Sequence, residues 1–293
     1  MRMEYDDAQR VISEAAVSSF DGSESDRYRT VMQALVKHLH GFAEEVQLTQ
    51  AEWMAGIEFL TRAGQVSGPR RQEMVLLSDI LGLSMLTVAI NEPKDPKVTA
   101  STVFGPFFVE NSPMVGRDGD LAQGAPGEPC FVSGTVSGSE GSPIAGARVE
   151  VWGADEDGLY DVQYDSTRIA NRGHQYTDVA GTFRFWTVMP VPYPIPTDGP
   201  TGELLRAARR TPMRPAHLHF MITAPGYEDL ITHIFVDGDP HLGSDAVFGV
   251  RPSLIGDYEF NPSGTAPDGS VREKGWFELK FDFVLGEEVD EVG

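Results

Sequence analysis

The chain has 293 residues, of which 41% are hydrophobic, and it carries a formal net charge of −21. This length allows one large domain, or one domain with a smaller companion, and the composition can bury a substantial core. A surface this acidic repels nucleic acid and anionic lipid headgroups, so we expect no nucleic-acid partner.

The segment up to Asn91 has a helical pattern. Apolar residues recur on one face of residues 27–45, and Thr49 with Glu52 forms a capping-box signature ahead of a second helix. A longer helix is expected with Pro69 in its first turn, because apolar residues follow at helical spacing. They are Met74, Leu77, Leu81, Met85 and Val88.

After Asn91 the pattern changes from helices to strands. Prolines interrupt the next stretch too often for a helix to survive. From Cys130 onward, short apolar runs are separated by Gly, Pro, Asp and Ser, which is typical of a β-sandwich. The expected strands are residues 130–136, 147–152, 182–187, 217–223, 230–236 and 276–284.

Two features bear on the cellular compartment. No apolar run reaches the about 18 residues of a membrane-spanning helix, and none follows the N-terminus as in a secretory signal. Cys130 is the only cysteine, which rules out an internal disulfide and a thiolate-rich metal site. We therefore expect a cytoplasmic protein without membrane insertion.

Two histidines and two tyrosines are the residues most indicative of chemistry. His217 and His219 stand as His-x-His in an expected strand, where side chains at i and i+2 share a face. Tyr160 lies in an aspartate-rich loop, and flanking prolines hold the backbone of Tyr193 extended. Each alone is compatible with ordinary packing. Because phenolate oxygen suits Fe(III) better than Zn(II) or Cu(I), together they indicate a mononuclear ferric enzyme.

The ordered motifs around these residues resemble one family. They are Gly158-Leu159-Tyr160, then Pro190-Val191-Pro192-Tyr193-Pro194-Ile195-Pro196, then Arg214-Pro215-Ala216-His217-Leu218-His219. The set is similar to that of the intradiol ring-cleavage dioxygenases, and the resemblance covers nearly the whole chain. It implies a mixed, mainly β fold. A helical N-terminal dimerisation region and the start of a linker would span residues 1–99, and a β-sandwich catalytic domain carrying the iron would span residues 100–293.

The resemblance also assigns a metal site for one Fe(III) per chain. The ligands it implies are Tyr160, Tyr193, His217 and His219. Tyr160 and His217 would be equatorial, and Tyr193 and His219 would be axial. Tyr164, which follows closely in the same loop, is the alternative to Tyr160.

Three residues are assigned catalytic roles in the same way. Tyr193 would leave the iron and accept a substrate proton. Arg214 would lie beside the substrate ring and stabilise developing charge. His233 would do the same, or would hold its neighbours by hydrogen bonding.

One strand distinguishes two branches of the family. Catechol cleavers typically carry glutamine on the strand after the His-x-His strand, whereas this chain has His233 there. Together with residues 101–108 and 239–250, this histidine is similar to the hydroxyquinol-cleaving branch. The pocket wall implied by this resemblance comprises Leu76, Asp79, Val103, Phe104, Gly105, Pro106, Phe107, Ile195, Pro196, Arg214 and Val247. Asp79 stands among apolar helix residues and needs a partner, which a third substrate hydroxyl could supply.

The implied reaction is Fe(III)-dependent cleavage of hydroxyquinol (benzene-1,2,4-triol) by O2 between its ortho hydroxyl carbons. The product would be 3-hydroxy-cis,cis-muconate, in equilibrium with maleylacetate. Two alternatives stay open: a catechol or chlorocatechol 1,2-dioxygenase with the same iron site, and a non-enzymatic β-sandwich binding module. By the same resemblance the N-terminal helices would form a homodimer, and family members can hold a phospholipid at that interface.

Overall fold

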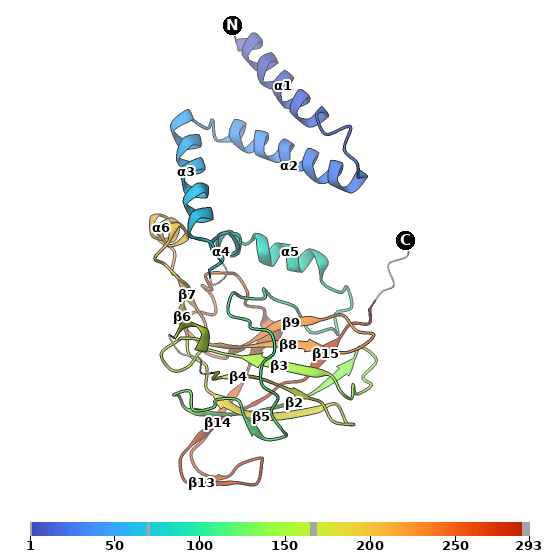
Figure 1. Ribbon diagram of the computed structural model, residues 1–293, viewed down its shortest axis with the longest axis vertical. Helices are drawn as coiled ribbons and strands as arrows, with labels where there is room; N and C mark the ends of the chain where they lie inside the picture. Colours follow the sequence, from blue (N-terminus) through green and yellow to red (C-terminus); the bar gives the residue numbers. More distant parts are fainter. Residues whose placement is uncertain (1, 69–70, 165–168, 289–293) are drawn as a thin grey trace. The chain divides into compact units, whose positions relative to one another are not determined.

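The computed structural model describes residues 2–68, 71–164 and 169–288, with the backbone alone for residues 2–7. By its internal contacts the chain forms two compact units, residues 1–62 and residues 63–293. The boundary between these units is not the one expected between a dimerisation region, residues 1–99, and a catalytic domain, residues 100–293. That functional division stays a prediction. Figure 1 gives the order of the elements along the chain.

The first unit is helical, with α1 (Arg2–Ser18), α2 (Asp26–Glu45) and most of α3 (Gln50–Val66). Ser25 caps α2 by accepting a hydrogen bond from the Tyr28 N–H. The capping box predicted ahead of α3 is confirmed. The Thr49 N–H donates to Glu52 Oε2 at 2.9 Å, and the Glu52 N–H donates to Thr49 Oγ1 at 3.2 Å.

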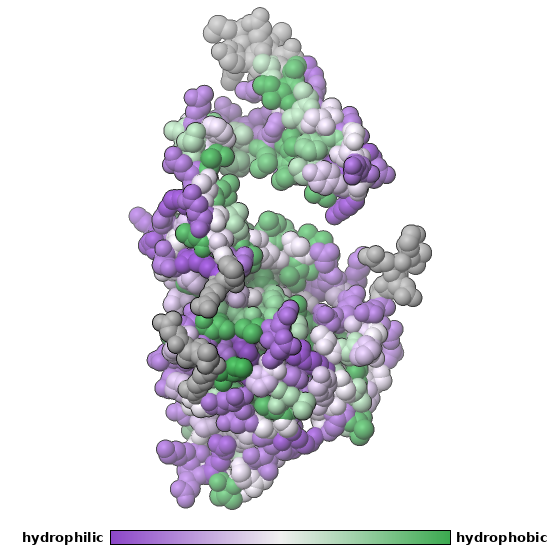
Figure 2. Space-filling view, in the orientation of Figure 1, coloured by the Kyte–Doolittle hydropathy of each residue, from purple (hydrophilic) through white to green (hydrophobic). Residues whose placement is uncertain are grey.

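The apolar row of α2 is exposed. Its side chains Val31, Leu35, Leu39 and Phe42 are 43–55% exposed, and no residue of α2 is buried by the described part of the chain. Figure 2 shows hydrophobic residues gathered over the helices of this unit. The amphipathic pattern therefore predicts the helix correctly, but packing inside this unit does not account for the row.

The long helix predicted from Pro69 onward is wrong in one respect, because the structure has two helices there. α4 (Glu73–Ile80) and α5 (Leu83–Asn91) are separated at Gly82, which adopts the left-handed conformation with φ 76°. Pro69 itself lies outside the described residues. No single described helix is long and apolar enough to cross a membrane, and α4 with α5 meets that test only as a pair bent by 76°.

Two sheets dominate the second unit (Figure 1). Their strands are β1 (Gly119–Asp120), β2 (Pro129–Gly138), β3 (Arg148–Trp152), β4 (Arg172–Tyr176), β5 (Thr182–Val188), β8 (His217–Thr223), β9 (Leu230–Val236), β10 (Ile255–Gly256), β11 (Tyr258–Asn261), β14 (Trp276–Lys280) and β15 (Phe283–Leu285). One sheet has the order β1–β5–β2–β14–β11, with β15 beside β2, and the other has the order β10–β9–β8–β3–β4.

Shorter elements complete the second unit. They are β6 (Tyr193–Pro194), β7 (Met213–Arg214), β12 (Gly264–Thr265), β13 (Val271–Arg272), α6 (Pro200–Ala207) and the 3-10 turns η1 (Asp161–Gln163) and η2 (Pro252–Leu254). β6 pairs with β7, and β12 pairs with β13.

Side chains from both large sheets meet in one buried core. Val132 on β2 and Phe185 on β5 pack in the same cluster as Val149 on β3 and Phe220 on β8. Two sheets that share a core through their inner faces form a β-sandwich. The mixed, mainly β fold predicted from the sequence is therefore confirmed.

The predicted strands match with one correction. Residues 217–223 and 230–236 form strands with those bounds, but the strand predicted over residues 276–284 is interrupted between β14 and β15. At the interruption the Asp282 carboxylate accepts the Thr135 N–H at 2.8 Å and so takes the place of a backbone ladder partner. The sequence pattern also misses β4, whose residues Arg-Gly-His-Gln-Tyr have no apolar alternation.

Strand alternation decides which residues of β8 face the site. Leu218 and Phe220 belong to the core, so His217 and His219 project from the opposite face. In the pairing of strands, His219 lies opposite His233 on β9 and Trp152 on β3. A separate pairing of β6 with β7 sets Tyr193 directly opposite Arg214.

Candidate active site

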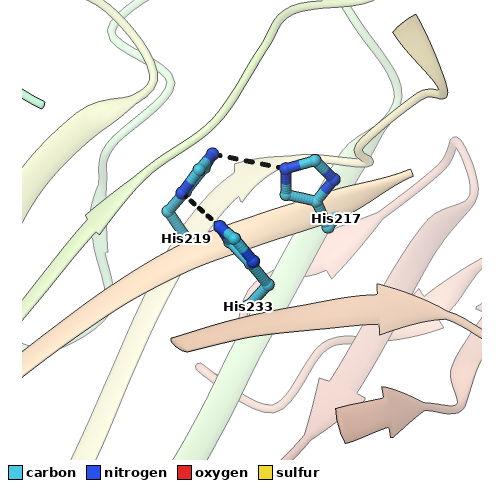
Figure 3. Close-up of side chains that lie close together, drawn as sticks. All are labelled: His217, His219 and His233. Atoms are coloured by element: carbon cyan, nitrogen blue, oxygen red, sulfur yellow. Dashed lines mark hydrogen bonds between the residues drawn. The ribbon is translucent and has the colours of Figure 1, made fainter. Parts of the chain in front are cut away.

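His217 and His219 are both buried, and a fixed partner holds the far side of each ring. His217 Nδ1 lies 2.6 Å from the Pro215 carbonyl oxygen, and His219 Nδ1 lies 2.8 Å from His233 Nε2. In Figure 3, dashed lines join His219 to His217 through one ring nitrogen and to His233 through the other. Since a carbonyl can only accept, His217 Nδ1 carries the proton, and the Nε2 lone pair of neutral His217 points into the site.

The two tyrosines reach the same point from outside the two large sheets, Tyr160 from a loop and Tyr193 from the short strand β6. The Tyr160 N–H donates to Gln163 Oε1 at 2.9 Å at the start of η1, and the Phe107 ring stacks on the Tyr160 ring with centroids 4.5 Å apart. Gly158 (φ 76°) lies so close to Tyr193 that a Cβ atom would stand 2.8 Å from Tyr193 Cβ. Glycine is therefore needed beside Tyr193 for two reasons, the backbone conformation and the space.

Four donor atoms, one from each predicted ligand, form a closed ring of short contacts, here called the ring of donors or the ring. Tyr160 Oη lies 2.9 Å from Tyr193 Oη and 2.8 Å from His219 Nε2. His217 Nε2 lies 3.3 Å from Tyr193 Oη and 3.3 Å from His219 Nε2. Among the described atoms, no hydrogen bond crosses either diagonal, Tyr160 to His217 or Tyr193 to His219. The four predicted ligands are thus brought together, all of them buried.

The ring fits a single metal ion. Donor atoms that share an ion at about 2.0–2.2 Å lie about 3 Å apart when they are neighbours, which matches the four contacts. Two phenol oxygens with two imidazole nitrogens are a donor set suited to ferric iron, whereas thiolate ligands, which favour zinc or Cu(I), are absent from it. A histidine cluster able to hold a metal is also formed by His217, His219 and His233. In that cluster, however, His233 faces His219 Nδ1, on the side away from the ring.

Burial sets the protonation of these side chains. It lowers the pKa of His217 to about 3 and lowers that of His219 well below its ordinary value, with help from neighbouring charge. It raises the pKa of Tyr193, against the effect of Arg214, and raises that of Tyr160 well above the ordinary value. The imidazoles are therefore neutral with free lone pairs. A bound cation would reverse the effect on the tyrosines, because it stabilises phenolate.

Arg214 is buried and clamped by Asp245. Arg214 Nε lies 3.2 Å from Asp245 Oδ1, and Arg214 Nη1 lies 3.2 Å from His217 Nε2. Burial works against the guanidinium charge, but Asp245 raises the pKa of Arg214 above its ordinary value. The Gly249 N–H donates to Asp245 Oδ2 at 2.9 Å, so backbone also holds the carboxylate. The result is a fixed positive charge at the edge of the ring.

A second buried ion pair holds the loop of Tyr160. Arg172 Nη2 donates to Asp161 Oδ1 and to the Phe107 carbonyl oxygen, each at 2.7 Å. Tyr164, the alternative ligand, is 41% exposed and donates instead to Asp155 Oδ2 at 2.6 Å. Tyr160 and not Tyr164 therefore belongs to the ring.

A pocket of about 50 Å³ opens beside the ring. It is lined by Arg71, Gln72, Glu73, Val75, Leu76, Asp79, Pro106, Phe107 and Pro196. Five of these residues were predicted for the pocket wall, whereas the segment 71–75 was not. Phe107, which stacks on Tyr160, joins the pocket to the ring. A larger cavity, of about 450 Å³, meets the site at Asp245.

The other residues predicted for the wall are not among the described residues that line this pocket, and of them Arg214 and Gly105 contact residues of the ring. Val103, Ile195, Arg214 and Val247 are buried. Phe104 packs against Phe108 and Trp152 rather than lining the pocket of about 50 Å³. Gly105 (φ 78°) lies against His219, since a Cβ atom would stand 2.9 Å from His219 Cε1.

Asp79 is buried in the pocket wall. Burial raises the pKa of its carboxyl above the ordinary value, although the Ser84 hydroxyl and the charge of Arg214 oppose that rise. The side chain thus lies where a polar substrate group could pair with it.

His233 has both ring nitrogens engaged. Nε2 faces His219, and Nδ1 lies 2.8 Å from Thr102 Oγ1. This geometry favours the second of the two roles considered for His233, holding a neighbour by hydrogen bonding.

Several residues of the site were missed by reasoning on the sequence. They are Trp152, which stacks on His219, and Thr102, Asp161, Arg172 and Asp245, whose partners are described above. Strand alternation in β3 could have placed Trp152 on the site face, because Val149 and Val151 are core residues. The others depend on contacts between segments far apart in the chain.

Known proteins are similar to this chain in both fold and sequence. The family model described as "Dioxygenase" matches residues 103–287, and the model described as "Catechol dioxygenase N terminus" matches residues 25–99. The chain therefore belongs to the intradiol ring-cleavage dioxygenase family.

Within that family the chain is most like the hydroxyquinol 1,2-dioxygenases. It is 53% identical to the hydroxyquinol 1,2-dioxygenase of Nocardioides simplex over 93% of both chains. The solved hydroxyquinol 1,2-dioxygenase of Pseudomonas putida DLL-E4 is 45% identical, with a TM-score of 0.90 over 97% of this chain and 100% of that one. The solved catechol 1,2-dioxygenase of Pseudomonas arvilla C-1 is 28% identical, with a TM-score of 0.81 over 97% of this chain and 93% of that one.

Proposed function

We propose that this chain is an Fe(III)-dependent intradiol dioxygenase that cleaves hydroxyquinol with O2 between the two ortho hydroxyl carbons. The product is 3-hydroxy-cis,cis-muconate, in equilibrium with maleylacetate. The observation that carries the proposal is the closed ring of two phenol oxygens and two imidazole nitrogens beside a buried arginine. The greater identity to hydroxyquinol dioxygenases than to a catechol dioxygenase supports the choice of substrate.

Tyr160, Tyr193, His217 and His219 would hold one Fe(III) per chain. The order of contacts supports the predicted pairing of Tyr160 with His217 and of Tyr193 with His219. The two members of each pair lie across a diagonal of the ring and not side by side. When bound, the ion would polarise the two ortho hydroxyls of the substrate, lower their pKa and make the ring electron-rich toward O2.

Tyr193 would take up one substrate proton at its Oη. Burial raises the pKa of Tyr193 when no cation stabilises its phenolate, so a phenolate released from such stabilisation would accept a proton readily. Arg214, across the β6–β7 pair, limits that rise. Tyr160 is held more tightly, by the Phe107 ring and the Arg172–Asp161 pair. This difference supports Tyr193, and not Tyr160, as the residue that moves a proton.

Arg214 would stabilise negative charge that develops on the substrate ring. Its guanidinium is buried, and Asp245 holds it in place before substrate arrives. A preorganised charge in a water-poor site is worth more than the same charge in water, because no reorganisation is needed during the reaction.

The N-terminal helices would form a homodimer in the cytoplasm, with residues 1–99 as the dimerisation region and start of the linker and residues 100–293 as the catalytic domain. The exposed apolar row of α2 supports a second copy as its partner. A phospholipid at this interface belongs to the same proposal.

Oxygen uptake with detection of the ring-opened product tests the function. The iron-loaded protein is given benzene-1,2,4-triol or catechol, with a protein-free blank because the triol autoxidises. Tyr193→Phe is expected to lose turnover, and Tyr164→Phe, a matched change in the same protein, is expected to keep it. Preference for catechol or chlorocatechol would overturn the substrate. A chain that binds no iron and consumes no oxygen would favour a binding module.

Asp79 tests the choice of substrate within the pocket. We propose that the third hydroxyl of the triol pairs with Asp79, and that plain catechol leaves this buried carboxylate unpaired. Asp79→Ala should then lower kcat/KM for the triol and raise it for catechol. If the variant cleaves the triol as well as the wild type and gains no activity on catechol, Asp79 does not select the substrate.

A further inference from the structure

One segment joins the ligand His219 to the substrate pocket. This segment, residues 100–107, is here called the strap. Its start is tied to β9 by two hydrogen bonds. The Thr102 N–H donates to the Ile231 carbonyl at 2.8 Å, and Thr232 Oγ1 donates to the Ala100 carbonyl at 2.7 Å. The strap is therefore fixed beside the strand that carries His233.

Farther along, the strap touches both parts of the site. Gly105 lies against the Cε1 edge of His219, where even a Cβ atom would be 2.9 Å away. Pro106 and Phe107 line the pocket, and Phe107 stacks on Tyr160. The position of the strap thus bears on two of the four ring donors.

A line of hydrogen-bonding groups runs from the strap to the ring of donors. Thr102 Oγ1 lies 2.8 Å from His233 Nδ1, His233 Nε2 lies 2.8 Å from His219 Nδ1, and His219 Nε2 lies 2.8 Å from Tyr160 Oη. Thr102, His233 and His219 are all buried. Water does not reach these groups freely, so each proton position constrains the next.

Only one order of protons leaves His219 able to bind a metal. A neutral imidazole has one N–H and one lone pair, and the lone pair of His219 must lie on Nε2. The His219 Nδ1–H then donates to His233 Nε2, and the His233 Nδ1–H donates to Thr102 Oγ1. In the reverse order His219 Nε2 carries the proton and cannot coordinate.

We propose that Thr102 is a positioning residue for His219: through His233, its hydroxyl accepts the proton that leaves His219 Nε2 free for iron. The proposal rests on the iron site of the proposed function. Without the hydroxyl, a buried His233 Nδ1–H has no acceptor, and the reverse order of protons becomes the better one. The strap then fixes the protonation of the ligand as well as the wall of the pocket.

Thr102→Val tests this, because it replaces the hydroxyl with a methyl group of similar shape. Thr102→Ser keeps the hydroxyl and loses the methyl. Thr232→Val is the matched control, since it removes another buried hydroxyl that bonds the same strap but does not touch the His233 ring. The readouts are iron affinity by competition with a chelator and the visible phenolate-to-iron absorption.

We expect Thr102→Val to weaken iron binding about 10–100-fold, and Thr102→Ser and Thr232→Val to change it by less than about threefold. Wild-type affinity in Thr102→Val would overturn the proposal. So would an equal loss in Thr102→Val and Thr232→Val, which would indicate strap packing, or an equal loss in Thr102→Ser, which would indicate the methyl group. If Thr102→Val does not fold, Thr102→Ala makes the same comparison with a smaller side chain.

Iron affinity is measured without turnover, so the proposed function and the positioning role of Thr102 can be disproved independently of each other. A wild-type protein that binds iron but does not cleave the triol would overturn the proposed function, while the Thr102 variants would still test the positioning of His219.

Discussion

The helix α2 and the site around His219 depart from the usual burial of side chains in opposite directions. α2 leaves a row of apolar side chains about half exposed, whereas the site buries charged and polar ones, among them Arg214, Asp245 and Asp79. Either arrangement costs free energy unless a further partner covers the apolar row or pairs with the polar groups. For α2 we propose a second copy of the chain, and for the site an iron ion and a hydroxylated ring. On these proposals, departures from the usual burial rule mark the working surfaces of the molecule.

Removing a ring donor should have the largest effect. Tyr160→Phe deletes one phenol oxygen, so we expect iron affinity to fall by more than the about 10–100-fold typical for a residue behind a ligand. The visible absorption should weaken with it. Both are measured by titration with iron and a competing chelator. Tyr164→Phe is the control, and an unchanged spectrum in Tyr160→Phe would remove Tyr160 from the ligands.

Breaking the buried ion pair should come next. Asp245→Ala leaves Arg214 as an unpaired buried charge, which is expected to lower the free energy of unfolding by about 3–5 kcal/mol. Asp198→Ala breaks an exposed pair with Arg71, in which Asp198 is 74% exposed, and should cost under about 1 kcal/mol. Urea unfolding of both variants measures the difference. Equal losses would show that burial does not separate the two pairs.

A charge placed in the exposed row tests the other side of the contrast. Leu35→Glu is expected to dissociate the proposed dimer, because a carboxylate in an apolar interface has no partner. Iron content should be unchanged. Lys37→Glu alters charge on the same helix outside the row, and should leave the dimer intact. Light scattering across a range of protein concentrations reports the outcome, and a dimer that survives Leu35→Glu would exclude the row as the interface.

The smallest effect is expected from Asp79→Asn. Because the folded-state pKa of Asp79 lies above the ordinary value of 3.8, the folded state holds the proton more strongly than the unfolded state. Stability is therefore lost as the pH rises through the folded-state pKa. Asp79→Asn should be more stable than wild type at pH 7, and the gain should shrink as pH falls toward 3.8. A gain that does not depend on pH would contradict this.

Local patterns predicted much of the fold. The cap of Thr49 and Glu52 marks the start of α3, and β8 and β9 have the predicted bounds, because hydrophobic period and capping are properties of neighbouring residues. The break at Gly82 was missed because a single glycine is tolerated in a helical pattern. Edge strand β4 was missed because its residues do not alternate.

The motifs in the sequence indicated which residues would form the metal site. They could not show that Tyr160 and Tyr193, 33 residues apart in the chain, would have phenol oxygens 2.9 Å apart. Nor could they show the partners behind the ligands, since Thr102 and His233 are separated by 131 residues.

What the order of residues determined is thus much of the secondary structure, the two histidines on one strand face and the identity of the donor atoms. These follow from side-chain chemistry and from the period of a strand, both of which are local. The tertiary structure decided the rest: which tyrosine joins the ring, which carboxylate clamps Arg214, and that His233 stands behind His219. Such contacts join segments far apart in the chain, and only the packing of the sandwich and its loops brings them together.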